Sequence, residues 1–118
     1  MIGHYAQADR GQLDTALDAA RSAQRKWATT CLEARQTILM SIGNELIERR
    51  VELGTLLSRE EGKPLAEGVG EVFRAGQFFT YYAAEVLRQI GDTADSVRDG
   101  VEIDVRREPV GVVAIISP

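Results

Sequence analysis

Cysteine and histidine are almost absent from this sequence of 118 residues, where Cys31 and His4 are the only examples. A single cysteine excludes an intrachain disulfide framework and a zinc site built on several thiolates. No apolar run reaches the length of a membrane span, and the first residues lack the basic and apolar regions of a secretory signal. We therefore expect a reduced, soluble, cytoplasmic protein without a resident metal.

Charge of one sign does not dominate the sequence either. Lys and Arg total 14 against 18 Asp and Glu, which gives a net charge of -4 at pH 7. These charges are interspersed along the chain, so they argue against nucleic acid or an anionic membrane as the main partner. Apolar residues make up 44% of the chain, enough for about one domain to bury a core.

Two helical regions are predicted in the first half of the chain, after one short strand at the amino terminus. Asp9 and Gln12 have the spacing of a helix-capping pair, and Thr30 and Glu33 have it again. The second region is expected to break or bend near Arg50. Apolar residues recur on one face of each region: Leu13, Ala16, Leu17, Ala20, Ala23 and Trp27 in the first, and Ile38, Leu39, Ile42, Leu46 and Ile47 in the second.

The third helical region has the most regular period. Gly62 suits the end of the preceding helix, Pro64 the first turn of this one, and Gly91 its end. Gly68 and Gly70 lie inside the helix, where each costs about 1 kcal/mol relative to Ala. We therefore expect both glycines to pack closely against another backbone. The apolar face comprises Leu65, Val69, Val72, Gly76, Phe79, Ala83, Val86 and Ile90.

Two strands are predicted after the helices. The stretch "DTADSVRDG" (92–100) reads as a polar turn, and "VEIDVR" (101–106) alternates as a strand with one solvated face. The run from Val110 to Ile116 is almost entirely apolar and β-branched, which indicates a strand buried on both faces of a parallel sheet. Because the neighbouring strands of such a sheet are missing from these residues, we expect the chain to be truncated.

Nucleotide-binding motifs are incomplete in this sequence. Gly68-Val69-Gly70 begins like a G-x-G-x-x-G fingerprint, but the third glycine is missing and the motif lies within a helix. Gly62-Lys63 resembles part of a P-loop without its upstream glycine and following Ser or Thr. Both are interpreted as structural.

Catalytic constellations are equally incomplete. Cys31 follows Thr30 near a helix start that could stabilise a thiolate, but its only available base is His4 and no spacing links the two. Glu67, Glu71 and Arg74 are spaced as a solvated charge network on one helix face. The aromatic residues Phe73, Phe78, Phe79, Tyr81 and Tyr82 are expected mostly in the core. No nucleophile, base and oxyanion site come together.

A set of collinear stretches nevertheless resembles one family. Trp27, "EARQTIL" (33–39), "LLSREEGKPLAEGVGEV" (56–72), "YYAAEVLR" (81–88) and "REPVGVVAIISP" (107–118) are similar to the amino-terminal part of NAD(P)-dependent aldehyde dehydrogenases. The branch acting on 2-oxoglutarate semialdehyde (2,5-dioxopentanoate) in sugar-acid breakdown is most similar, and succinate-semialdehyde dehydrogenases come next. Ala114 and Ser117 depart mildly from the family pattern, which more often has glycine and threonine.

The resemblance implies an α/β fold of three main helices, a bridging strand and the first strand of the Rossmann-like nucleotide-binding sheet. It divides the chain into a helical part of the cofactor-binding domain (1–92), a polar turn with the bridging or oligomerisation strand (93–109), and the truncated first sheet strand (110–118). It places Ile116, Ser117 and Pro118 where the backbone borders NAD or NADP.

By the same resemblance, the intact protein is a homo-oligomer, a dimer or tetramer, that oxidises a small, carboxylated aldehyde. The reaction passes through a cysteine thiohemiacetal, hydride transfer to NAD(P) and thioester hydrolysis. The family's catalytic Cys and Glu lie downstream, so this chain by itself has no catalytic residue; Gly76-Gln77-Phe78 matches the family's cysteine segment only by coincidence. The alternatives are a succinate-semialdehyde dehydrogenase and a non-enzymatic helical interaction module.

Overall fold

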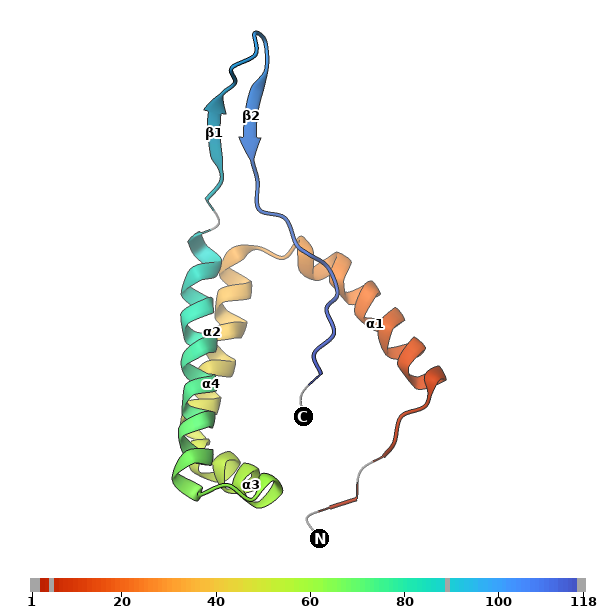
Figure 1. Ribbon diagram of the computed structural model, residues 1–118, viewed down its shortest axis with the longest axis vertical. Coiled ribbons are helices and arrows are strands. Elements are labelled where there is room, and N and C mark those ends of the chain that lie inside the picture. Colours follow the sequence, from red (N-terminus) through yellow and green to blue (C-terminus); the bar gives the residue numbers. More distant parts are fainter. Residues whose placement is uncertain (1–2, 5, 89, 117–118) are drawn as a thin grey trace. The chain divides into compact units, whose positions relative to one another are not determined.

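The computed structural model of the protein describes residues 3–4, 6–88 and 90–116. They form two compact units, which differ in their secondary structure (Figure 1). The first unit contains Cys31–Arg88 together with the start of the chain, and it is helical. The second contains Gln7–Thr30 and Gln89–Pro118, and it combines one helix with a β-hairpin.

The helical unit is built around α4 (Leu65–Glu85), which packs against both α2 (Leu32–Glu48) and α3 (Arg50–Glu61). Figure 1 shows α2 and α4 side by side, with α3 folded back at one end of the pair. The predicted break of the second helical region is confirmed, one residue earlier than expected. Arg49 ends α2 and precedes α3, with φ -88° and ψ 13°.

Glycines on facing helices bring the backbones of this unit into direct contact. A methyl group on Gly54 of α3 would lie 2.6 Å from both the Cα and the N of Val69, and one on Gly68 would lie 2.5 Å from the carbonyl oxygen of Gly54. Gly43 of α2 and Gly76 of α4 are related in the same way, with added methyl groups 2.9 and 2.8 Å from each other's carbonyl oxygen. The helices therefore approach as closely as their main chains allow.

The predictions for the two glycines inside α4 have opposite outcomes. Gly68 is buried against α3, as expected. Gly70 is exposed, and nothing lies within 4 Å of the position that its Cβ would take, so the expected close contact is wrong there. The reason is geometric: residues two apart on a helix point to nearly opposite sides, and only one of them can face α3.

Some of the predicted helix ends are confirmed and others are wrong. Gly62 ends α3 with φ 79°, and Pro64 precedes α4 as its N-cap. Thr30 is not a cap: its hydroxyl donates to the carbonyl oxygen of Lys26, and Cys31 occupies the N-cap of α2 without a side-chain hydrogen bond. Gly91 does not end α4, which stops at Glu85 and continues as the short 3₁₀ helix η1 (Val86–Arg88).

The aromatic residues of α4 are not in a core. Phe73, Phe78, Phe79, Tyr81 and Tyr82 are 36–59% exposed, and the only contact recorded between two aromatic rings among the described residues is an edge-to-face pair of Tyr81 and Tyr82. α2 and α3 pack against the side of α4 that carries Gly68 and Gly76. The described residues of this unit form no second layer over the opposite side of α4. The expectation of core packing is therefore wrong for this chain.

In the second unit, α1 (Arg10–Ala28) begins with the predicted capping pair. The Gln12 N–H donates to Asp9 Oδ1 at 2.8 Å, and the Asp9 N–H donates to Gln12 Oε1 at 2.9 Å. The rest of this unit contains the antiparallel hairpin of β1 (Asp92–Asp95) and β2 (Glu102–Val105). The expected strand at the amino terminus is not found among residues 3–4 and 6–9.

The hairpin confirms one strand and corrects a predicted turn. β2 lies within the predicted strand 101–106, whereas β1 occupies the start of the stretch that was expected to be a turn. Pairing with β2 gives the backbone N–H and C=O groups of β1 hydrogen-bond partners, although its aspartate-rich sequence has little preference for a strand. The register pairs Ala94 with Ile103 and Asp92 with Val105 on one face, and Thr93 with Asp104 and Asp95 with Glu102 on the other.

The apolar segment at the end of the chain forms no strand in residues 110–116. Gly111 has φ 107°, which interrupts an extended conformation, and the described residues contain no third strand to pair with the segment. Val110, Ile115 and Ile116 are at least 90% exposed; their burial was expected only against the neighbouring strands of a sheet that these residues do not contain. Assignment of 110–118 to a nucleotide-binding sheet, like the rest of the predicted domain division, remains a prediction.

The glycine contacts lead to a prediction about stability. Gly54→Ala places a methyl group against the α4 backbone, and we expect it to lower the free energy of unfolding by about 1–3 kcal/mol. Gly70→Ala is the matched control, because its methyl group meets open space and helix propensity favours Ala by about 1 kcal/mol. Urea denaturation followed by circular dichroism compares the two. Equal stability of both variants would contradict direct backbone contact.

Candidate functional site

The predicted cofactor-binding residues lie at the end of the chain. Ile116 belongs to the segment without regular secondary structure, and it is 94% exposed. Ser117 and Pro118 lie outside the described residues. The predicted nucleotide-bordering site is thus represented by Ile116 alone, which is open to solvent in this chain.

Cys31 and His4 are not joined into a catalytic pair. Both residues are exposed, Cys31 at the N-cap of α2 and His4 in an irregular segment. No hydrogen bond connects these two described residues. The structural interpretation of Cys31 therefore fits the geometry better than a role as nucleophile.

The two glycine motifs have structural roles. Gly68 packs on Gly54, and no helix N-terminus is available at Gly68-Val69-Gly70 to hold a phosphate, because the motif lies within α4. Gly62-Lys63 is the predicted junction between α3 and α4. Both interpretations made from the sequence are confirmed.

Lys63 forms an ion-pair cluster at this junction that sequence reasoning missed. Its Nζ donates to Glu61 Oε2 and to both carboxylate oxygens of Glu71, each at 2.7 Å. Hydrogen bonds to Glu61 and then Glu71 raise the pKa of the Lys63 ammonium. The signal in the sequence was Gly62, because a left-handed residue turns the chain and brings position 63 back toward α4. Glu71 thus pairs with Lys63 across the junction, and none of the ion pairs recorded among the described residues joins it to Glu67 or Arg74, the network that the spacing predicted.

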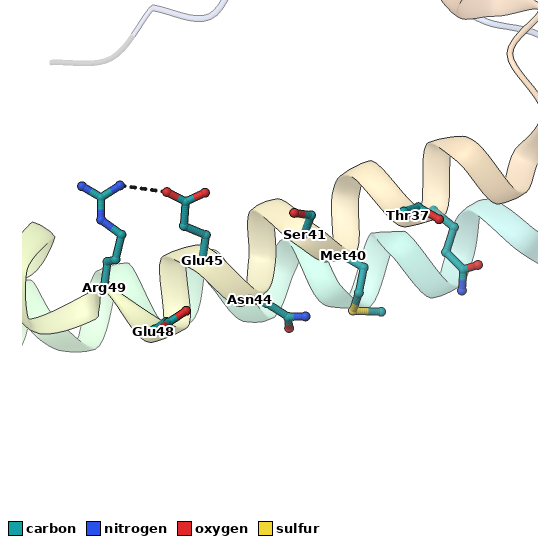
Figure 2. Close-up of a pocket in the computed structure, with 8 residues that line it drawn as sticks. Thr37, Met40, Ser41, Asn44, Glu45, Glu48 and Arg49 are labelled. Carbon is teal, nitrogen blue, oxygen red and sulfur yellow. Dashed lines mark hydrogen bonds and ion pairs between the residues drawn. The ribbon is translucent and has the colours of Figure 1, made fainter.

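The other cluster lies on the exposed face of α2 (Figure 2). Figure 2 shows two rows of side chains, with Ser41, Glu45 and Arg49 on one side and Met40 and Asn44 on the other. All the residues that line the depression between them belong to α2 or its C-cap: Gln36, Thr37, Met40, Ser41, Asn44, Glu45, Glu48 and Arg49. One helix alone forms this shallow groove, so it does not enclose a ligand.

Arg49 bridges the break between α2 and α3. Its guanidinium donates to Glu45 Oε1 at 2.8 Å and to both oxygens of Glu52, at 2.9 and 3.0 Å. These bonds, first to Glu52 and then to Glu45, raise the pKa of Arg49 further above its usual range. The hydrogen bond from Arg49 likewise lowers the pKa of the Glu52 carboxyl. The cluster therefore joins carboxylates of α2 and α3 across the bend, and its hydrogen bonds are all taken up by this structural contact.

Metal-ligand clusters and membrane-spanning helices are not found in the part of the chain that the structure describes. Within residues 3–4, 6–88 and 90–116, no three side chains of His, Cys, Asp or Glu come together as metal ligands. Over the same ranges, no helix combines the length and the apolar character needed to cross a bilayer.

The family relationship covers the whole sequence. The profile of the aldehyde dehydrogenase family matches residues 1–118. This chain therefore belongs to the aldehyde dehydrogenase family, which confirms the resemblance described above.

Individual relatives are similar to this chain over nearly all of its length. The NADP(+)-dependent succinate-semialdehyde dehydrogenase of Escherichia coli is 33% identical over 117 residues, 99% of this chain and 24% of its own length. The alpha-ketoglutarate semialdehyde dehydrogenase of Haloferax volcanii is 33% identical over 118 residues, 100% of this chain and again 24% of its own length. The chain thus spans about a quarter of the length of these relatives.

A solved structure confirms the fold. Betaine aldehyde dehydrogenase of Staphylococcus aureus, in complex with NAD+, superposes with a TM-score of 0.81 at 25% identity, covering 89% of this chain and 22% of that one. The helices and the two-stranded sheet therefore match the amino-terminal part of the aldehyde dehydrogenase fold. NAD or NADP, the predicted cofactor class, is also the cofactor named for these relatives.

The Arg49 cluster predicts a pH dependence of stability. Because the pKa of Glu52 is lowered in the folded chain, its contribution is present above the ordinary value of 4.5 and is lost as the pH falls through the folded value. We expect Glu52→Gln to reduce the loss of stability on acidification below about pH 4.5. Urea midpoints measured across this range test it. Glu60→Gln removes the same charge from α3 outside the recorded ion pairs of the described residues, and it should leave the acid slope unchanged.

Proposed function

We propose that this chain is the amino-terminal part of an NAD(P)-dependent aldehyde dehydrogenase that oxidises 2-oxoglutarate semialdehyde to 2-oxoglutarate. The observation that carries the proposal is the 33% identity to an alpha-ketoglutarate semialdehyde dehydrogenase, over an alignment that covers 100% of this chain. The stretches "SREEGKPLAEGVGEV" and "DSVRDGVEIDVRREPVGVV" support the same branch.

Succinate semialdehyde is the second candidate substrate. A succinate-semialdehyde dehydrogenase is equally identical to this chain, at 33%. Both candidate substrates are short aldehydes with a carboxylate at the far end, so the proposal is stronger for this class of substrate than for either member. The residues that would bind the carboxylate are not assigned to this chain.

The chain contributes to the cofactor site by its last residues. Ile116, Ser117 and Pro118 would border the nucleotide, which accepts a hydride when it is bound. The 94% exposure of Ile116 is compatible with a ligand beside it. One exposed residue forms a border and not a complete pocket, so the remaining contacts to the cofactor must come from other parts of the intact protein. We propose that the intact protein is a dimer or tetramer.

The chain alone should not oxidise aldehydes. Its one thiol, Cys31, is exposed at the N-cap of α2 without a base bonded to it. We therefore expect no formation of NADH or NADPH when the purified chain is incubated with semialdehydes, measured by absorbance. Turnover that disappears in Cys31→Ala would overturn this prediction, and Ser22→Ala, in α1, serves as the matched control.

The substrate class is tested on the full-length enzyme. We expect kcat/KM to be highest for 2-oxoglutarate semialdehyde, lower for succinate semialdehyde and much lower for acetaldehyde, because only the first two carry the terminal carboxylate. A preference for succinate semialdehyde would select the second candidate. A preference for acetaldehyde would reject the carboxylated class.

A further inference from the structure

Arg35, in α2, has a buried hydrogen-bond donor without an acceptor. Its Nε atom is shielded from solvent and has no hydrogen-bond partner among the described residues. The ion pairs recorded for the same residues do not include Arg35. An arginine stays charged at any physiological pH, and a buried donor of a charged group is costly to leave unpaired. The guanidinium therefore needs an acceptor that this part of the chain does not provide.

Exposed apolar side chains continue from Arg35 along the same side of α2. Ile38 and Ile42 follow it by three and seven positions, which is the spacing of neighbours on one helix face. Both are large and apolar, and they are 45% and 39% exposed. The unpaired charge thus lies at one end of an uncovered apolar stripe.

Two aromatic residues of α4 extend this stripe. The helices run antiparallel (Figure 1), and Gly43 and Gly76 face each other. Counted from these glycines at 3.6 residues per turn, Ile42 and Phe79 are turned to the same side of the pair, by about 100° and about 60°. Phe79 and Tyr82 are 36% and 57% exposed. At 1.5 Å per residue the five side chains span about 10 Å along the helices. We call this surface the Arg35 face: Arg35, Ile38, Ile42, Phe79 and Tyr82.

We propose that the Arg35 face is the docking surface for a segment of the intact protein outside these 118 residues, and that this segment presents an Asp or Glu carboxylate to Arg35. The chain spans about a quarter of the length of its relatives, so a family member has further polypeptide to cover the face. A buried guanidinium needs a counter-charge, and its planar fork matches a carboxylate through two parallel hydrogen bonds. The inference goes beyond the proposed function, because it does not depend on the substrate.

The size of the Arg35 face favours a segment of the same polypeptide over a second copy of the protein. A stable interface between separate subunits buries about 800 Å² per partner. Four apolar side chains that are 36–57% exposed do not offer such an area. A segment of the same polypeptide needs less, because the covalent connection already keeps it at a high effective concentration.

The occupant of the Arg35 face is tested by photo-crosslinking in the full-length enzyme. Ile42 is replaced by p-benzoylphenylalanine, and the same replacement of Asn44 is the matched control. The two positions point to nearly opposite sides of α2, and Asn44 lines the polar groove of Figure 2. We expect the Ile42 variant to cross-link within one polypeptide to a residue outside positions 1–118, and the Asn44 variant to give no such product. A cross-link to positions 1–118, a cross-link between two copies, or none at all would overturn the inference.

The charge of the occupant is tested by Arg35→Met in the same enzyme. Arg74→Met is the matched control, because Arg74 is exposed on α4 and forms no ion pair recorded among the described residues. We expect the midpoint of thermal unfolding to fall by about 3 °C or more in Arg35→Met, since a buried carboxylate loses its partner. In Arg74→Met the midpoint should change by less than about 1 °C. Equal midpoints in the two variants would reject the ion pair.

A double-mutant cycle then identifies the carboxylate. Replacing the Asp or Glu nearest to the cross-link by its amide should lower the midpoint in the wild-type enzyme and have little further effect in Arg35→Met. Additive effects would show that this carboxylate does not bind Arg35. None of these measurements requires turnover, so a different substrate would refute the proposed function and leave the docking surface unaffected.

Discussion

The contact of one helix backbone with another is the constraint on which the helical unit depends. At Gly43 and Gly76, and again at Gly54 and Gly68, a single methyl group would meet main-chain atoms. Side chains can adopt other rotamers when they are crowded, but backbone atoms of a helix cannot move without moving the helix. The distances of α2 and α3 from α4 are therefore set by the absence of side chains at these positions.

The ion pairs act at the bend and the turn between the helices, which the glycine contacts do not determine. Close backbone contact sets how far apart two helices lie, whereas the bend between α2 and α3 and the turn between α3 and α4 are determined where the chain changes direction. Arg49 binds carboxylates on both sides of the bend, and Lys63 binds carboxylates on both sides of the turn. Exposed ion pairs contribute little to stability, so their main effect here is on geometry.

Local patterns of the sequence predicted much of the fold, and long-range contacts account for what they missed. The Asp9 cap, the end of α3 at Gly62 and the break near Arg50 all depend on neighbouring residues. Thr30 failed as a cap because its hydroxyl had a competing acceptor in the previous turn, at Lys26. The strand β1 could not be predicted from its own aspartates, because its stability comes from pairing with β2. Lys63 was missed because it belongs to the junction between α3 and α4, and its partner Glu71 lies eight positions further on, within α4.

The candidate site was predictable only through the family. Ile116, Ser117 and Pro118 carry no chemically distinctive side chain, since a backbone that borders a ligand leaves little trace in the residue types. The structural roles of the glycine motif and of Cys31 were easier to predict, because an incomplete motif and an isolated thiol can be recognised from their spacing in the sequence.

The register of the hairpin gives the small sheet a sidedness. Asp95, Glu102 and Asp104 lie on one face, while Ala94, Ile103 and Val105 lie on the other. Covering the first face with another layer of protein would remove carboxylates from water, at a cost that only matched cations could offset. Covering the second would bury β-branched side chains and only one carboxylate, that of Asp92 at its edge. Any element that packs on this hairpin is thus directed to one side of it, and a slip of one residue in β2 would place its carboxylates and its apolar side chains on the opposite faces.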